Sequence, residues 1–151
     1  MPLMKSDMAS ALKDIDMPSG PGPAADAWAT AWWKYAKGCT QALASSSETP
    51  AKAAFKSSFE GACKDSNSAS DGDKMLEDAM KAGWKAVIWL PAYMGPPTIV
   101  SPLLLKSVLE DNAKNKLDKS AARDAIADKI NTWTTMITVT DSSSGSPVPL
   151  S

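Results

Sequence analysis

The sequence contains no histidine, and Arg123 is the only arginine among its 151 residues. Without imidazole the chain has no Ser-His-Asp or Cys-His nucleophile pair, no histidine general base and few ligands for a transition metal. A glycine-rich dinucleotide turn and a GxxxxGK[ST] phosphate loop are also missing. These absences remove the usual sites of hydrolases, metalloenzymes and nucleotide-binding enzymes. We therefore expect a non-enzymatic protein with no cofactor and no metal.

A surplus of one charge sign is also missing, because 16 basic and 17 acidic residues leave a net charge of -1 and are spread along the chain. Nucleic-acid binding needs a clustered basic face, so we do not expect it as the main activity. The longest apolar run, residues 86 to 90, is far shorter than the roughly 20 residues of a membrane-spanning helix. Acidic residues interrupt the N-terminal MPLMKSDMASALKDID, which lacks the apolar core of a signal peptide. We expect no membrane partner and synthesis in the host cytoplasm.

Cysteine is scarce, with only Cys39 and Cys63, on two different predicted helices. We interpret both as small buried hydrophobic residues, with a disulfide between them as the alternative.

One acidic stretch, SNSASDGDKMLED, has some features of a calcium-binding loop. Aligned on its glycine, the stretch brings five residues to liganding positions: Asn67, Ala69, Asp71, Asp73 and Asp78. Ala69 has no side-chain ligand, and Asp78 is shorter than the bidentate glutamate of such loops. We interpret the stretch as a solvated loop in which Asp71 or Asp73 caps the following helix.

Apolar residues recur at helical spacing through most of the chain. The central helix is predicted over residues 73 to 90, ended by Pro91 and followed by the proline-rich loop YMGPPTIVSP. Further helices are predicted over residues 3 to 16, from Pro23 to about 45, and from the starts Thr49-Pro50, Ser101-Pro102 and Asp118 or Ser120. The fold class is mainly α, a compact bundle of about five to six helices.

The end of the chain has a different pattern. TTMITVT, residues 134 to 140, alternates with Ile137 and Val139 on one side, which predicts a short C-terminal β-strand. DSSSGSPVPLS then predicts an extended tail, and the strand needs a partner from its own fold or from another chain. We divide the chain into an N-terminal helical arm and Pro/Gly linker (1-22), a helical core domain (23-137), and a C-terminal strand and extended arm (138-151).

Several apolar and aromatic residues lie outside the predicted core stripes and are candidates for contacts between subunits. Trp33 falls beside the stripe of its helix, and the others lie in the proline-rich loop or near the C-terminus. The candidate interface comprises Trp33, Tyr93, Met94, Ile99, Val100, Ile137, Val139, Val148 and Leu150.

Three stretches carry a resemblance of layout over residues 24 to 150: DAWATAWWKYAKG, GWKAVIWLPAYMGPPTIVSP, and INTWTTMITVT with its proline-rich end. In this layout the chain resembles small structural proteins of tailed bacteriophages. The resemblance implies a non-enzymatic virion component of the neck, tail or baseplate. It also implies a homo-oligomer of several symmetric copies that contacts other virion structural proteins. It assigns a role to no particular residue.

The expected function is therefore that of a virion subunit assembled through its apolar loop and terminal arms. The alternative is a monomeric helical protein that encloses a small apolar ligand between Trp84, Trp89, Met80, Phe55 and Phe59. Self-association distinguishes the two, since a ligand carrier is monomeric.

Overall fold

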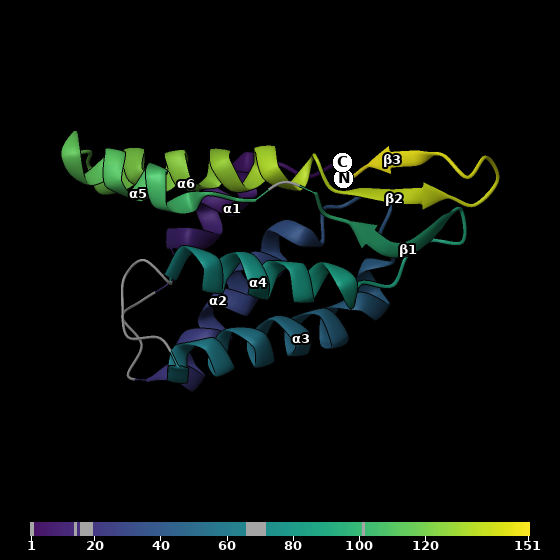
Figure 1. Ribbon diagram of the computed structural model, residues 1–151, viewed down its shortest axis with the longest axis horizontal. Coiled ribbons are helices and arrows are strands. Elements are labelled where there is room, and N and C mark those ends of the chain that lie inside the picture. Colours follow the sequence, from purple (N-terminus) through teal and green to yellow (C-terminus); the bar gives the residue numbers. More distant parts are fainter. Residues whose placement is uncertain (1, 14, 16–19, 66–71, 101) are drawn as a thin grey trace.

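The computed structural model describes residues 2-13, 15, 20-65, 72-100 and 102-151 (Figure 1). Its helices are α1 (Lys5–Lys13), α2 (Pro21–Ala36), α3 (Ala44–Asp65), α4 (Gly72–Lys85), α5 (Leu105–Lys114) and α6 (Lys119–Thr134). Its strands are β1 (Tyr93–Thr98), β2 (Thr138–Asp141) and β3 (Pro147–Pro149). The predicted fold class, a mainly helical bundle with a short C-terminal β element, is confirmed.

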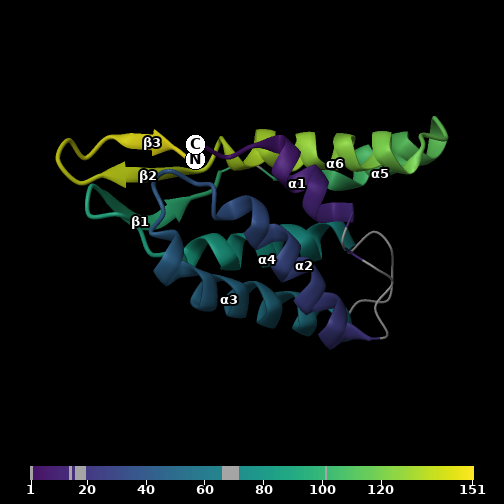
Figure 2. The same ribbon diagram turned by 180° about the vertical axis from the view of Figure 1, so that it is seen from behind.

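The helices form two groups, and a small sheet extends from one end of them (Figures 1 and 2). One group contains α2, α3 and α4, in which α3 packs on both neighbours. The other contains α5 and α6, which form a hairpin, and α1, which packs on α6 and also on α2. The sheet lies at the end of the body where α6 ends.

Aromatic side chains join α2, α3 and α4 at the centre of the molecule. Trp32 of α2 stacks on Phe55 of α3, with ring centroids 5.3 Å apart, and meets Trp84 of α4 edge-on at 5.4 Å. All three side chains are fully buried. Helical spacing in the sequence predicts one stripe of Trp28, Trp32, Tyr35, Cys39 and Leu43. It is confirmed for Trp32 and Tyr35, which lie in this core, whereas Leu43 lies beyond the end of α2 and is 37% exposed.

The predicted boundary between the second and third helices is wrong. α2 ends at Ala36, and α3 already begins at Ala44 and continues through Pro50. At the first turn of α3, the Ser47 hydroxyl donates to the Leu43 carbonyl (2.8 Å), with the Ile88 carbonyl also near at 3.1 Å, and accepts from the Ile88 amide (2.9 Å). The helix therefore begins six residues before Pro50, with its first turn bonded to a distant segment.

The central helix is also shorter than predicted, because α4 ends at Lys85. The next residues run extended beside residues 41-43, where Leu43 donates to the Ile88 carbonyl (2.8 Å) and Leu90 to the Gln41 carbonyl (3.0 Å). Pairing with residues 41-43 thus satisfies backbone N–H and C=O groups of residues 88-90, which periodicity alone placed in a helix.

The proline-rich loop that follows contains a strand. β1 pairs with β2, and β2 with β3, in an antiparallel sheet of order β1-β2-β3. Val139 is buried and lies opposite Val148, and Ile137 on the same predicted side of TTMITVT is also buried. Both outer strands contain prolines, which is where a sheet tolerates them. Within the described residues, the partners of the C-terminal strand come from its own fold.

Both ends of the chain contribute to the core, although the sequence suggested arms at each end. Met8 and Leu12 of α1 are buried, and Lys5 pairs with Asp128 of α6 at 3.2 Å. At the other end Leu150 is buried, and its amide donates to the Ile137 carbonyl at 2.9 Å. The extended arm assigned to residues 138-151 is instead a hairpin folded onto the body, because its apolar residues alternate with polar ones and complete the core.

The helix predicted from Ser101-Pro102 begins later, at Leu105. Leu104 precedes it with a left-handed backbone (φ 53°, ψ 44°), so it does not continue the helix. Ser101, predicted as the cap, lies outside the described residues. The sixth helix starts as predicted, since the Asp118 side chain accepts from the Ala121 amide at 2.8 Å.

We predict opposite effects for two glycine-to-alanine substitutions. A Cβ on Gly83 would lie 2.4 Å from the Trp32 ring, which is rigid and enclosed, so Gly83→Ala should lower the free energy of unfolding by about 1 to 3 kcal/mol. Gly61 of α3 is exposed with no atom near its added Cβ, so Gly61→Ala should raise it by up to about 1 kcal/mol. Denaturant unfolding measures both, and equal effects would contradict the close contact.

Candidate functional site

Four of the predicted interface residues lie in the core of the chain: Trp33, Ile137, Val139 and Leu150. Trp33 is covered because α2 lies between α1 and α3, so the side of α2 beside its predicted stripe is also buried. The other three are covered because the C-terminal hairpin folds onto the body. These side chains are not available on the surface of the folded subunit, which corrects their assignment from sequence.

The remaining candidates are at least partly accessible. Tyr93, Ile99 and Val148 are half-buried, whereas Met94 is 49% exposed and Val100 is 77% exposed. Val100 is therefore the most exposed large apolar side chain among the described residues. The proline-rich loop predicted to present apolar residues does present these two.

Six exposed large apolar residues are not among the candidates named from sequence: Met4, Leu43, Ile88, Leu104, Leu117 and Met136. Met136 is 48% exposed, and the alternation that turns Ile137 inward already turns Met136 outward. Leu104 is 57% exposed, although a helix that starts at Pro102 would place Leu104 on its inner face with Leu105 and Val108. Its left-handed backbone turns it away from that face, and periodicity gives no signal for this.

We group Val100, Leu104 and Met136 under the name junction patch, because all three lie in the segments that join the sheet to the helices. Thr98 and Thr138 are paired in the sheet, and Val100 and Met136 each lie two residues beyond that pair, at the same end of the ladder. Leu104 comes at the end of the segment that joins β1 to α5. The junction patch thus lies where the sheet meets the helical body (Figure 1).

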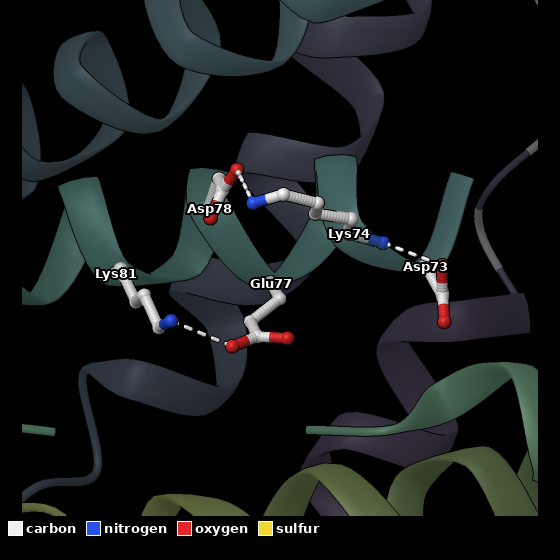
Figure 3. Close-up of polar contacts among 5 residues, drawn as sticks. All are labelled: Asp73, Lys74, Glu77, Asp78 and Lys81. Atoms are coloured by element: carbon white, nitrogen blue, oxygen red, sulfur yellow. Dashed lines mark hydrogen bonds and ion pairs between the residues drawn. The ribbon is translucent and has the colours of Figure 1, made fainter. Parts of the chain in front are cut away.

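The acidic side chains of α4 are engaged with neighbouring groups along the helix (Figure 3). Asp73 accepts from the Lys74 amide at 2.7 Å, which is a contact at the start of the helix. Lys74 pairs with Asp78 at 3.1 Å, and Lys81 with Glu77 at 2.6 Å. The other positions of the calcium-loop alignment, 67, 69 and 71, lie outside the described residues. In the described part of the chain no three His, Cys, Asp or Glu side chains group as a metal site.

A buried polar cluster lies beside the aromatic core. The Tyr35 hydroxyl donates to Asn131 Oδ1 at 2.9 Å, and burial raises the pKa of Tyr35. Burial also raises the pKa of the Cys39 thiol, which is unpaired. Both groups are therefore protonated at neutral pH, as expected of structural residues and not of activated nucleophiles. The side chain of Cys63 is outside the described part.

Gln41 holds the C-terminal residues to the body. Its side chain is buried, and its Nε2 donates to the Pro149 carbonyl (2.9 Å) and to Ser151 Oγ (3.1 Å). Its Oε1 accepts from the Ser151 amide at 3.1 Å. The Thr40 amide adds a hydrogen bond to the Ser151 carbonyl at 2.7 Å. The Gln41 side chain thus satisfies both a backbone carbonyl and a backbone N–H of this segment.

An apolar hollow of about 300 Å³ opens between the two groups of helices. Its lining comprises Trp28, Phe59, Asp73, Met75, Leu76, Leu105 and Ile126. It does not coincide with the predicted ligand cage. Phe55, Met80 and Trp84 of that cage are fully buried in the core, and only Phe59 belongs to both.

None of the described helices is both long and apolar enough to span a bilayer. In comparisons with known proteins, no family model, curated protein or solved structure matches this chain.

We predict that Gln41→Leu lowers the free energy of unfolding by about 1 to 3 kcal/mol, because the Pro149 carbonyl and the Ser151 amide lose their buried partner. Carboxypeptidase should then remove C-terminal residues faster than from the wild type. Ser45→Ala on the exposed surface of α3 is the control and should change neither measurement. Unchanged digestion of Gln41→Leu would show that this side chain does not hold the segment.

We also predict a pH-dependent change in the turn between β2 and β3. The Asp141 carboxylate accepts from the hydroxyl and amide of Ser143 (2.6 and 2.9 Å) and the amide and hydroxyl of Ser144 (2.8 and 3.1 Å). The Ser143 hydroxyl and these further donors lower the Asp141 pKa from 3.8 to about 2. Since the folded-state pKa is depressed, the stabilisation is complete above pH 3.8 and is lost as the pH falls through about 2.

The Ser143 and Ser144 amide resonances should report this loss in an NMR titration. In Asp141→Asn the side-chain oxygen still accepts hydrogen bonds but does not titrate, so the transition should disappear. Its persistence in Asp141→Asn would assign it to another group.

Proposed function

We propose that the chain is a non-enzymatic structural subunit of a tailed-phage virion, in the neck, tail or baseplate, that assembles as a symmetric oligomer. The observation that carries the assembly part is the junction patch. Val100, Leu104 and Met136 expose about half of their surface or more at one place in the fold. Exposed large apolar side chains are typical of contact sites between proteins when they gather in one patch. The virion part rests on the layout of the sequence over residues 24 to 150.

The chemistry of the described residues supports a role without bond-making. The Tyr35 hydroxyl and the Cys39 thiol, which are the buried titratable groups, have raised pKa values and are occupied in packing. The α4 carboxylates are engaged within their own helix. In this proposal these groups stabilise the folded subunit, and the subunit acts through contacts made by its surface.

Assembly in this proposal uses side-chain contacts and not added strands. Both edges of the sheet carry prolines, at 96 and 97 on β1 and at 147 and 149 on β3. Proline has no N–H to donate to an incoming strand, so both edges are poor templates for pairing with another chain. The C-terminal segment is in addition held by Gln41. We therefore place the contact between subunits on the apolar loop, and not on the terminal arms expected from the sequence.

A second candidate is supported by the apolar hollow beside Trp28 and Phe59. Its volume of about 300 Å³ is at the lower end for ligand pockets, and its lining is mostly apolar with one carboxylate, Asp73. A small apolar molecule bound there would quench or shift the emission of Trp28. This function requires no self-association.

We predict that the purified chain forms a discrete oligomer whose mass is an integer multiple of 15.9 kDa. Native mass spectrometry and sedimentation over a range of concentrations measure this multiple. A closed symmetric assembly gives one defined species, since each copy satisfies its neighbour's contact surface. A chain that stays monomeric at every concentration while an apolar probe binds beside Trp28 would replace the proposed function with the carrier.

A further inference from the structure

The apolar hollow between the two groups of helices combines aromatic, aliphatic and acidic side chains. Two aromatic rings, those of Trp28 and Phe59, lie beside each other in its wall, with centroids 6.3 Å apart and planes tilted by 31°. Four further apolar side chains complete this surface: Met75, Leu76, Leu105 and Ile126. Among the described residues that line the hollow, Asp73 is the one that carries a charge. A molecule bound here therefore meets apolar and aromatic surface and one carboxylate.

The lysines of α4 do not neutralise this carboxylate. Lys74 directs its ammonium to Asp78 at 3.1 Å, and Lys81 pairs with Glu77 at 2.6 Å (Figure 3). Asp73 Oδ1 accepts from the Lys74 amide at 2.7 Å, and no ion pair to Asp73 is present among the described side chains. The half-buried Asp73 therefore places a negative charge at the hollow without a cation of the described chain to balance it.

This lining discriminates between ligands by their charge. An anionic ligand would bring a second negative charge beside Asp73, and the described lining includes no lysine or arginine to receive it. A neutral apolar ligand would displace water from the carboxylate without replacing its hydrogen bonds, which is unfavourable. A cation attached to an apolar group matches both parts of the lining, because a carboxylate and the face of an aromatic ring both attract positive charge.

We propose that this hollow binds a small organic cation, an amine or quaternary ammonium that carries an apolar group. The Asp73 carboxylate and the aromatic pair of Trp28 and Phe59 attract the cationic head, and the remaining apolar side chains contact the rest of the molecule. The volume of about 300 Å³ limits the ligand to a small one. This site goes beyond the proposed function and does not depend on it, because all of its lining comes from one chain.

Three probes that share a benzyl group test the charge preference on the unaltered chain. Benzylamine is a cation at neutral pH, benzyl alcohol is neutral and phenylacetate is an anion. In NMR titrations, benzylamine should shift the Trp28 indole N–H and the Ile126 methyl resonances and bind about fivefold or more tightly than benzyl alcohol, with phenylacetate the weakest. Equal or tighter binding of benzyl alcohol or phenylacetate would overturn the inference, as would an absence of saturable benzylamine binding at these residues.

A second test removes the charge and keeps the shape. In Asp73→Asn the side-chain oxygen can still accept from the Lys74 amide, so the start of α4 is preserved. This variant should bind benzylamine about fivefold or more weakly than the wild type and benzyl alcohol equally well. Asp78→Asn is the matched control, because it makes the same charge change on the same helix at a residue outside the described lining, and it should change neither affinity.

Wild-type benzylamine affinity in Asp73→Asn, or an equal loss in Asp78→Asn, would overturn the inference. Both tests measure binding and not assembly, so their outcome is independent of the sedimentation result that tests the proposed function.

Discussion

The segment from Gln41 to Leu43 connects the helical body to both of its extended neighbours, and the rest of the structure depends on these contacts. Ala42 bridges to Trp89, and backbone hydrogen bonds on either side fix residues 88-90 in an extended path. The Gln41 side chain holds the last residues of the chain. Because these groups are buried or part-buried, each unmade hydrogen bond would be unfavourable. One short loop thus sets where α4 ends, where α3 begins and where the sheet lies.

The aromatic core and the C-terminal hairpin bury most of the large apolar side chains in the described part of the chain. Trp32 and Trp84 fill the centre so closely that only glycine fits at position 83. The hairpin buries Val139 and Leu150 against the body. Prolines occupy both edges of the resulting sheet. In the proposed assembly, a chain closed in this way would offer apolar side chains, and not open strands, to its partners.

Periodicity predicted the helical class, the burial of Trp32, the Asp118 cap and the shared side of Ile137 and Val139, because local spacing decides each of them. It was wrong about α3 and α4, where Ser47 and the 41-43 segment impose long-range hydrogen bonds that no local pattern contains. For the candidate site, exposure of Met94 and Val100 followed from their proline-rich loop. Leu104 could not be found, since its left-handed backbone results from the burial of its neighbours in the completed fold.

Amide hydrogen exchange at Leu150 tests most directly whether this chain is a closed subunit. The Leu150 amide donates to the Ile137 carbonyl at 2.9 Å beneath a buried side chain. If the C-terminal segment belongs to the core of each subunit, this amide exchanges as slowly as core amides of α2, at protein concentrations both below and above the onset of assembly. Exchange at the rate of an unstructured peptide in the dilute protein, with protection only on assembly, would show that the segment is an arm exchanged between subunits and would contradict the account.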